Sequence, residues 1–298
     1  MSIAWLFPGQ GSQKLGMADD VLSLSGALER FQSASQILGR DLLKICKESN
    51  KEKNSIFDLN DTRNTQPAIF VVESLLVDAL ISKGRKPSLV AGHSLGEFVA
   101  LYAAGVFSAQ EGLKLICRRS QLMADAGGGA MTALIGFERK QLEELVQATE
   151  GAYVANDNSS SQVVLSGTSE AVQEVTSELT FKRAIPLQVS GAFHTPLMGK
   201  ASQSFASELE KVDFQDAHFP VLSNSNPDPT INATLLKERL KNQMTTGVRW
   251  RQTMEELTKQ GIVNLIEVGP GNVLSGLAKR SLTGVSTNQV SSAKDVQP

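Results

Sequence analysis

The sequence predicts an α/β protein in which a parallel sheet has helices on both faces and carries a small inserted unit of the ferredoxin-like βαββαβ type. Two observations predict this class. Short apolar strands alternate with helical segments over the first 125 residues, and this alternation returns after the small unit. Between the two stretches, after the triplet Gly127, Gly128 and Gly129, the elements follow a different order. Strands separated by helices are typical of a parallel sheet.

The first part of the chain supplies two strands and the helices around them. Residues 3–7 are an apolar run that stops at a Pro-Gly turn, as a buried strand does, and residues 88–91 form a second short strand. Helices are expected at 67–80, where apolar residues recur at helical spacing, and at 96–106 and 110–123.

The inserted unit is predicted from its own succession of elements. These are a strand at 131–136, a helix at 140–149, strands at 153–156 and 162–166, a helix at 169–179 and a strand at 183–189. The order β-α-β-β-α-β is that of the ferredoxin-like split βαβ unit.

The larger unit resumes after the insertion. Its expected elements are a strand at 221–224, helices at 235–244 and 250–260, and a strand at 264–268. From Gly284 onward the chain is polar, so we expect this stretch to be mostly unassigned or frayed. The predicted division is therefore a large unit of residues 1–127 and 191–284, an inserted unit of residues 128–190, and a C-terminal tail of residues 285–298.

Composition excludes several classes of function. The 298 residues carry 29 basic and 31 acidic side chains, without the basic excess of a nucleic-acid binder. No apolar run approaches the roughly 18 residues of a membrane span, because Glu73 and Asp78 interrupt the stretch 68–81. The N-terminus lacks the charged region of a signal peptide. Cys46 and Cys117 are too far apart for a zinc or disulfide pattern. A cytoplasmic enzyme is the favoured class.

The segment Gly92-His93-Ser94-Leu95-Gly96 matches the nucleophile pattern G-x-S-x-G. It lies between a predicted strand and a predicted helix, which is the context that the pattern requires, because a sharp turn there projects the serine hydroxyl. The N-terminus of the following helix adds free backbone N–H groups that could hold an oxyanion. Ser94 is therefore the candidate nucleophile.

A serine nucleophile needs a base, and the chain has three histidines. The side chain of His93 should diverge from Ser94 across the turn, and His218 lies in a polar segment where solvation is expected. His194 follows the inserted unit, at the crevice between the two units where a site is expected. His194 is thus the predicted base. Asp157 lies between Ser94 and His194 in chain order, but it belongs to the inserted unit and is not assigned as a triad acid.

Two further features stay open from the residues alone. Either of Arg118 and Arg119 could point inward from its helix, where a guanidinium would suit a substrate carboxylate. The glycine-rich loop Gly9 to Gln13 could hold a phosphate, although it lacks the lysine of a P-loop, or it could place a backbone N–H near the nucleophile.

Five ordered motifs together resemble one family. They are FPGQGSQ at 7–13, TQPA at 65–68, GHSLGE at 92–97, GAFH at 191–194 and EVGPG at 267–271. The combination resembles the malonyl-CoA:acyl carrier protein transacylase type of the acyltransferase family of fatty-acid and polyketide synthesis. The resemblance extends over residues 3–281. It implies a hydrolase-like α/β domain with an inserted ferredoxin-like subdomain, in agreement with the prediction from the pattern of elements.

The resemblance implies a role for several residues. Ser94 would be acylated with His194 as its base, and the backbone N–H groups of Gln10 and Leu95 would form the oxyanion hole. Arg119, 25 residues after the serine as in the family, would bind the malonyl carboxylate, and Gln66 would line the pocket.

Two more positions follow from the same resemblance. The family orients its histidine with a main-chain carbonyl, and the matching residue is Gln243. The chain has Thr246-Gly247 where the family usually has Asn-Pro, a departure that puts the backbone path at Gln243 in doubt. Phe193 before the histidine resembles the malonyl-selective form of the motif. The physical reason for this selectivity is that an aromatic ring fills the space that an α-methyl group needs.

The implied reaction is ping-pong transfer of malonyl from malonyl-CoA to the phosphopantetheine thiol of acyl carrier protein, supplying fatty-acid synthesis. The resemblance implies no metal or other cofactor. It implies neither nucleic acid nor a membrane as a binding partner, and it suggests that the protein is a monomer. The alternatives are a serine hydrolase or thioesterase, a polyketide-pathway transferase, and a non-catalytic scaffold. Carrier proteins are acidic, so basic residues are candidates for docking: Lys182, Arg183, Arg249, Arg251, Lys279 and Arg280.

Overall fold

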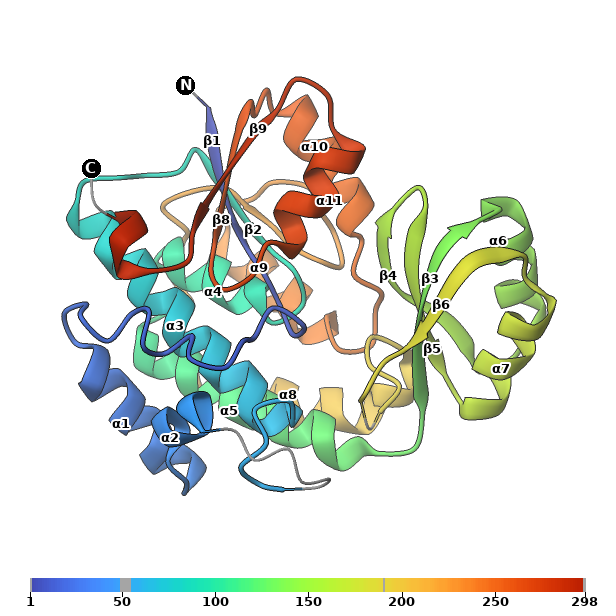
Figure 1. Cartoon of the computed structure of the whole chain (residues 1–298), viewed down its shortest axis with the longest axis horizontal. Coiled ribbons are helices and arrows are strands. Elements are labelled where there is room, and N and C mark those ends of the chain that lie inside the picture. The colour runs from blue at the N-terminus through green and yellow to red at the C-terminus, as the bar shows by residue number, and fades with distance from the viewer. Residues whose placement is uncertain (1, 49–54, 190, 297–298) are drawn as a thin grey trace.

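Two sheets organise the computed structural model, which describes residues 2–48, 55–189 and 191–296 (Figure 1). The first sheet has five strands in the order β7-β2-β1-β8-β9, and all of its pairings are parallel. Its strands are β1 (Ile3–Phe7), β2 (Leu89–Gly92), β7 (Val221–Leu222), β8 (Asn264–Val268) and β9 (Ser286–Val290).

Helices cover both faces of this sheet. They are α1 (Ala27–Leu38), α2 (Leu42–Lys47), α3 (Thr62–Ser82), α4 (Gly96–Ala103), α5 (Ala109–Ala126), α8 (Gly199–Leu209), α9 (Ala233–Asn242), α10 (Trp250–Lys259) and α11 (Val273–Ser281), with short 3-10 turns at Pro196–Met198 and Ala293–Val296. Alternate residues of β1 point to opposite faces, as a strand requires. Trp5 and Phe7 join the core formed with α3, α4 and α5, whereas Ala4 and Leu6 join the core formed with α10 and α11.

The second sheet has four antiparallel strands in the order β4-β5-β3-β6. Its elements are β3 (Ala130–Phe137), α6 (Arg139–Ala148), β4 (Ala152–Ser159), β5 (Gln162–Gly167), α7 (Ser169–Glu178) and β6 (Phe181–Pro186). In Figure 1, α6 and α7 cover the face turned away from the larger sheet. The succession is the predicted βαββαβ order, and the predicted α/β fold class is confirmed.

Residues of β4 attach the small sheet to the larger unit. Val248, just before α10, donates its N–H to the carbonyl of Ala155 at 2.8 Å, and its own carbonyl accepts the N–H of Asp157 at 2.9 Å. The carboxylate of Asp157 also binds Arg139 at 3.0 Å and Arg251 of α10 at 2.9 Å. The edge of the small sheet is therefore attached to the segment that leads into α10.

The structure corrects the prediction for the C-terminal segment. The stretch after Gly284 is not frayed, because Ser286–Val290 forms β9 and pairs in parallel with β8. Val290 is the buried residue of this edge strand and its other side chains are polar, so composition hides the strand. We propose to keep the division into 1–127 with 191–284, and 128–190, and to join residues 285–296 to the large unit.

Helix α3 begins earlier than the predicted 67–80. It starts at Thr62, after the N-cap Asp61, and contains Pro67. Proline cannot donate to the carbonyl four residues earlier. That carbonyl, of Arg63, instead accepts a bond from Arg40 Nη2 at 3.1 Å. A side chain from elsewhere in the chain thus allows the helix to continue through the proline.

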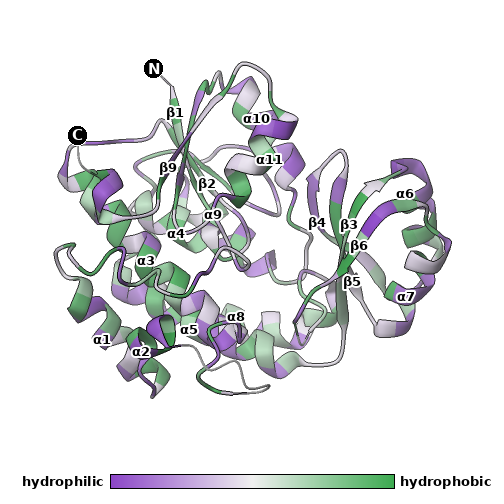
Figure 2. Cartoon of the chain, in the orientation of Figure 1, coloured by the Kyte–Doolittle hydropathy of each residue, from purple (hydrophilic) through white to green (hydrophobic). Residues whose placement is uncertain are grey.

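Among the described helices, α3 is the one that is long and apolar enough to cross a membrane by length and composition. Hydrophobic residues predominate along it in Figure 2. Most of its apolar stretch, 78%, is buried inside the protein, as in the core helix of a globular domain.

Candidate active site

Ser94 stands on a sharp turn between β2 and α4. Its φ is 53°, a left-handed conformation that is rare for a residue with a side chain. The glycines of the motif make the turn possible. A Cβ on Gly92 would lie 1.9 Å from the backbone of Gly96, and a Cβ on Gly96 would lie 2.0 Å from the carbonyl of Phe7. No other residue type fits at either position.

His194 lies against Ser94. Its Nε2 is 2.8 Å from Ser94 Oγ, and its Nδ1 is 2.9 Å from the backbone carbonyl of Gln243. A carbonyl accepts but does not donate, so Nδ1 carries the proton and Nε2 is free to accept from the serine. Burial and the nearby charge of Arg119 lower the pKa of His194 to about 3. The imidazole is therefore neutral at pH 7, in the tautomer that a general base requires.

The Gly247 departure from the family pattern has a packing reason. A Cβ on Gly247 would lie 2.6 Å from the carbonyl of Val154 on β4. Glycine thus allows the segment after Gln243 to lie directly against the small sheet. The structure places the Gln243 carbonyl beside His194 despite this departure.

The other two histidines and Asp157, which were weighed as base or acid, contact residues other than Ser94 and His194. His93 Nε2 is 2.8 Å from Asn158 Oδ1, and its ring tilts against Trp250. His218 is exposed and packs against Phe219. Asp157 is held in its ion pairs with two arginines.

Arg119 points inward and is 1% exposed, whereas its neighbour Arg118 is exposed. Its Nη1 donates to Gln66 Oε1 at 2.6 Å, and its Nη2 donates to Ser94 Oγ at 3.1 Å and to Gln243 Oε1 at 3.0 Å. Phe98 lies under the guanidinium. These hydrogen-bond acceptors are neutral, and burial lowers the pKa of Arg119 to about 10, against the opposing charge of Glu97. Arg119 therefore stays cationic at pH 7, although no carboxylate among the described residues forms an ion pair with it.

A small cavity of about 90 Å³ opens in front of the serine. Its wall includes Ser94, His194, Arg119, Gln66 and Phe193, together with Gln10, Leu95, Met123 and Met131. A charged group and a nucleophile thus face the same space. The backbone N–H groups of Gln10 and Leu95 donate to no acceptor within the described ranges, and Leu95 is the N-cap of α4. The position suits two donors to an oxyanion.

Sequence reasoning missed two residues of this cluster, Asn224 and Glu97. Asn224 follows β7, the neighbour of β2 in the parallel sheet, so its side chain comes to the same sheet edge as Ser94. A polar residue two positions after the end of a buried strand was the available signal. Glu97 belongs to the GHSLGE motif, but a glutamate in the first turn of a helix is usually exposed, and here it is fully buried.

A serine bonded to a neutral histidine, with free N–H groups at a helix N-terminus, defines a class of α/β enzymes that transfer acyl groups through a serine ester. The chain belongs to the acyl transferase domain family, whose model matches residues 4–296. The family predicted from the motifs is thereby confirmed.

Individual relatives cover nearly the whole chain. A malonyl CoA-acyl carrier protein transacylase of Synechocystis sp. is 46% identical over 296 residues, which is 99% of each chain. The crystal structure of the Synechocystis malonyl-CoA:ACP transacylase matches with a TM-score of 0.94 and 46% identity, again over 99% of both chains. A malonyl-transacylase solved in complex with its type II PKS acyl-carrier protein matches with a TM-score of 0.90 and 36% identity, over 99% of this chain and 98% of that one.

Proposed function

We propose that the chain transfers the malonyl group of malonyl-CoA to the phosphopantetheine thiol of acyl carrier protein, in supply of fatty-acid synthesis. The observation that carries this proposal is the buried Arg119, whose Nη2 lies 3.1 Å from the nucleophilic oxygen of Ser94. A hydrolase for simple esters has no use for a buried cation at that position. The relatives named as malonyl transacylases support the same substrate.

In the first half-reaction, Ser94 Oγ attacks the thioester carbonyl while His194 Nε2 takes the serine proton. The N–H groups of Gln10 and Leu95 would stabilise the oxyanion. Collapse of the tetrahedral intermediate breaks the C–S bond, and His194 returns the proton to the sulfur of coenzyme A. In the second half-reaction the thiol of the carrier attacks the malonyl ester, with His194 again as base, and Ser94 is released. These steps need only residues of this chain and the two thiol carriers.

Arg119 would select the acyl group in two ways. Its guanidinium would bind the malonyl carboxylate, which an acetyl group lacks. The bound carboxylate would also offset the positive charge that lowers the pKa of His194. A malonyl substrate would therefore strengthen the base that attacks it, whereas an acetyl substrate would not. Phe193, on the cavity wall, would exclude an α-methyl group.

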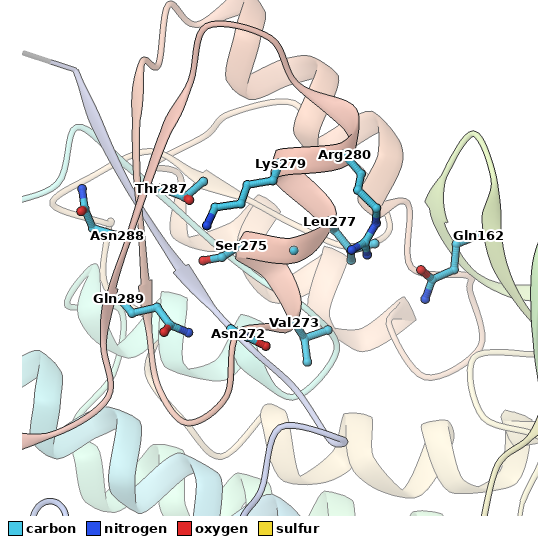
Figure 3. A pocket seen from close by; sticks show the side chains of 11 residues that line it. Gln162, Asn272, Val273, Ser275, Leu277, Lys279, Arg280, Thr287, Asn288 and Gln289 are labelled. Atoms are coloured by element: carbon cyan, nitrogen blue, oxygen red, sulfur yellow. The ribbon is translucent and has the colours of Figure 1, made fainter.

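Docking of the acidic carrier is proposed at the basic end of α11. Lys279 and Arg280 line an open pocket of about 610 Å³ with Gln289 of β9 and Gln162 of the small unit (Figure 3). Both are exposed and in no ion pair among the residues that the structure describes. Arg251, by contrast, is bound by Asp157 and Glu255. Lys279→Glu with Arg280→Glu should slow transfer to the carrier and spare acylation by malonyl-CoA. Unchanged transfer would contradict this docking site.

Intact mass spectrometry after mixing with malonyl-CoA tests the function itself. We expect a gain of one malonyl group, about 86 Da, that is absent in Ser94→Ala and weak with acetyl-CoA. Release of coenzyme A without an adduct would instead indicate a hydrolase, and neither product would indicate a scaffold. We also propose that the protein is cytoplasmic and monomeric, and size-exclusion chromatography of the purified protein tests the oligomeric state.

A further inference from the structure

Side chains hold both peptide groups that flank Ser94. The Ser94 N–H donates to Asn224 Oδ1 at 2.6 Å, and the Ser94 carbonyl accepts from Gln243 Nε2 at 2.8 Å. Asn224 also donates through Nδ2 to the carbonyl of Gly92 at 2.6 Å. The left-handed turn at Ser94 is therefore held by side chains more than 100 positions away in the chain, in addition to the local bond from the Glu97 N–H to the Ser94 carbonyl at 3.2 Å.

Both of these residues meet at Glu97. Its Oε2 accepts from Gln243 Nε2 at 2.7 Å and from the N–H of Asn224 at 3.2 Å. On the other side of the amide, Gln243 Oε1 faces Arg119 Nη2 at 3.0 Å. With acceptors on its nitrogen side and a guanidinium on its oxygen side, the Gln243 amide has one orientation that satisfies every partner.

This orientation has a consequence for the oxyanion site. The carbonyl of Ser94 and the N–H of Leu95 belong to one planar peptide group and point in opposite directions. Fixing the carbonyl toward Gln243 thus fixes the direction of the Leu95 N–H. A carbonyl that accepts a hydrogen bond also polarises its peptide, which makes the N–H a better donor.

We propose that Glu97 is a positioning residue: it holds the Gln243 amide so that the Ser94–Leu95 peptide presents its N–H to the oxyanion and Arg119 keeps its place beside the serine. This inference rests on the proposed acylation of Ser94. It assigns to the Gln243 side chain a task separate from that of the Gln243 carbonyl, which binds His194.

A double-mutant cycle tests the proposal. The variants are Glu97→Leu, Gln243→Leu and the two together, with Glu97→Gln as the matched control that keeps an acceptor at the Oε2 position. The rate constant for malonylation of Ser94 is measured in a single turnover by quenched-flow mass spectrometry. The assay temperature is kept below the melting temperature of every variant. Removal of one oxyanion donor costs about 100–1,000-fold, so its misorientation should cost each leucine variant about 10–100-fold.

The expected result is coupling between the two sites. The double variant should be no slower than the slower single variant, and Glu97→Gln should stay within about fivefold of the wild type. Effects that multiply, or a Glu97→Gln rate as low as that of Glu97→Leu, would overturn the proposal. Gln243→Leu at the wild-type rate would also overturn it, even if Glu97→Leu does not fold. If the wild-type protein is not acylated at Ser94 at all, the result contradicts the proposed function as well as this inference.

Discussion

Two glutamates on neighbouring helices, Glu97 of α4 and Glu73 of α3, are both fully buried. Burial raises the pKa of each carboxyl group. Their surroundings differ. Glu97 accepts from Gln243 and Asn224 and lies in the field of Arg119, and these interactions oppose the effect of burial.

Glu73 has no such compensation. Neither of its carboxyl oxygens has a hydrogen-bond partner among the described residues, and the charge of Glu267 raises its pKa further. Glu267 itself accepts the N–H groups of Leu274 and Ser275 at the start of α11, at 3.0 and 2.8 Å. Glu73 instead packs on Gly269, where a Cβ would lie 2.3 Å from its Oε1.

Burial of the same type of side chain therefore has two different consequences. A carboxylate with donors and a nearby cation can hold a polar site together. A carboxyl without them remains protonated in the folded protein and lowers stability as the pH rises. Variants around Glu97 should therefore change reaction rates, and variants of Glu73 should change stability but not rates.

The largest effect is expected for His194→Ala. Loss of the base leaves Ser94 protonated and without a proton acceptor, so acylation by malonyl-CoA should slow by about 10⁴-fold or more. Single-turnover mass spectrometry measures it. His218→Ala, at an exposed histidine, is the matched control and should react at the wild-type rate. A His194→Ala rate within tenfold of the wild type would mean that another group acts as the base.

Arg119→Ala should change the preference between substrates. Hydrogen bonds to a charged group contribute about 1.5–3 kcal/mol, so kcat/KM for malonyl-CoA should fall by about 10–100-fold. The value for acetyl-CoA should stay the same or rise, because no buried cation is left without a partner. Arg118→Ala, at the exposed neighbour, is the control. Equal losses for the two substrates would contradict a role in binding the carboxylate.

The same variant should shift the pH dependence. The proposed reaction needs neutral His194, whose pKa is lowered to about 3 by burial and by the charge of Arg119. For the wild type, kcat/KM with acetyl-CoA should therefore show no loss from histidine protonation above about pH 4. Without Arg119 the pKa of His194 rises, so the acidic limb should move to higher pH. An unchanged limb in Arg119→Ala would show that this charge does not act on the base.

The sequence predicts the parts of the site that local patterns mark. Ser94 is predicted because glycines flank it between a strand and a helix, and His194 is predicted because few histidines compete with it. Asn224 and the Gln243 side chain could not be placed in this way, since their partners lie more than 100 residues away. The fold shows the same limit. The apolar strand β1 was predicted at residues 3–7, whereas the polar edge strand β9 has a single buried side chain and depends on pairing with β8.

The smallest effect concerns stability and Glu73→Gln. The folded-state pKa of Glu73 lies well above the ordinary value, so its contribution to stability is fully present below about pH 4.5 and is lost as the pH rises toward the folded-state pKa. Glutamine does not titrate. The melting temperature of Glu73→Gln relative to the wild type should therefore increase between pH 5 and pH 8, by about 1.5 °C for each kcal/mol of relative stabilisation in a chain of this length. Glu150→Gln, at an exposed glutamate, should show no such trend. Malonylation of Ser94 should proceed at the wild-type rate, since within the described ranges the Glu73 carboxyl group has no hydrogen bond to a residue of the site. A difference in melting temperature between Glu73→Gln and the wild type that does not change with pH would mean that Glu73 is ionised in the folded protein. The two buried glutamates would then not differ in the way described.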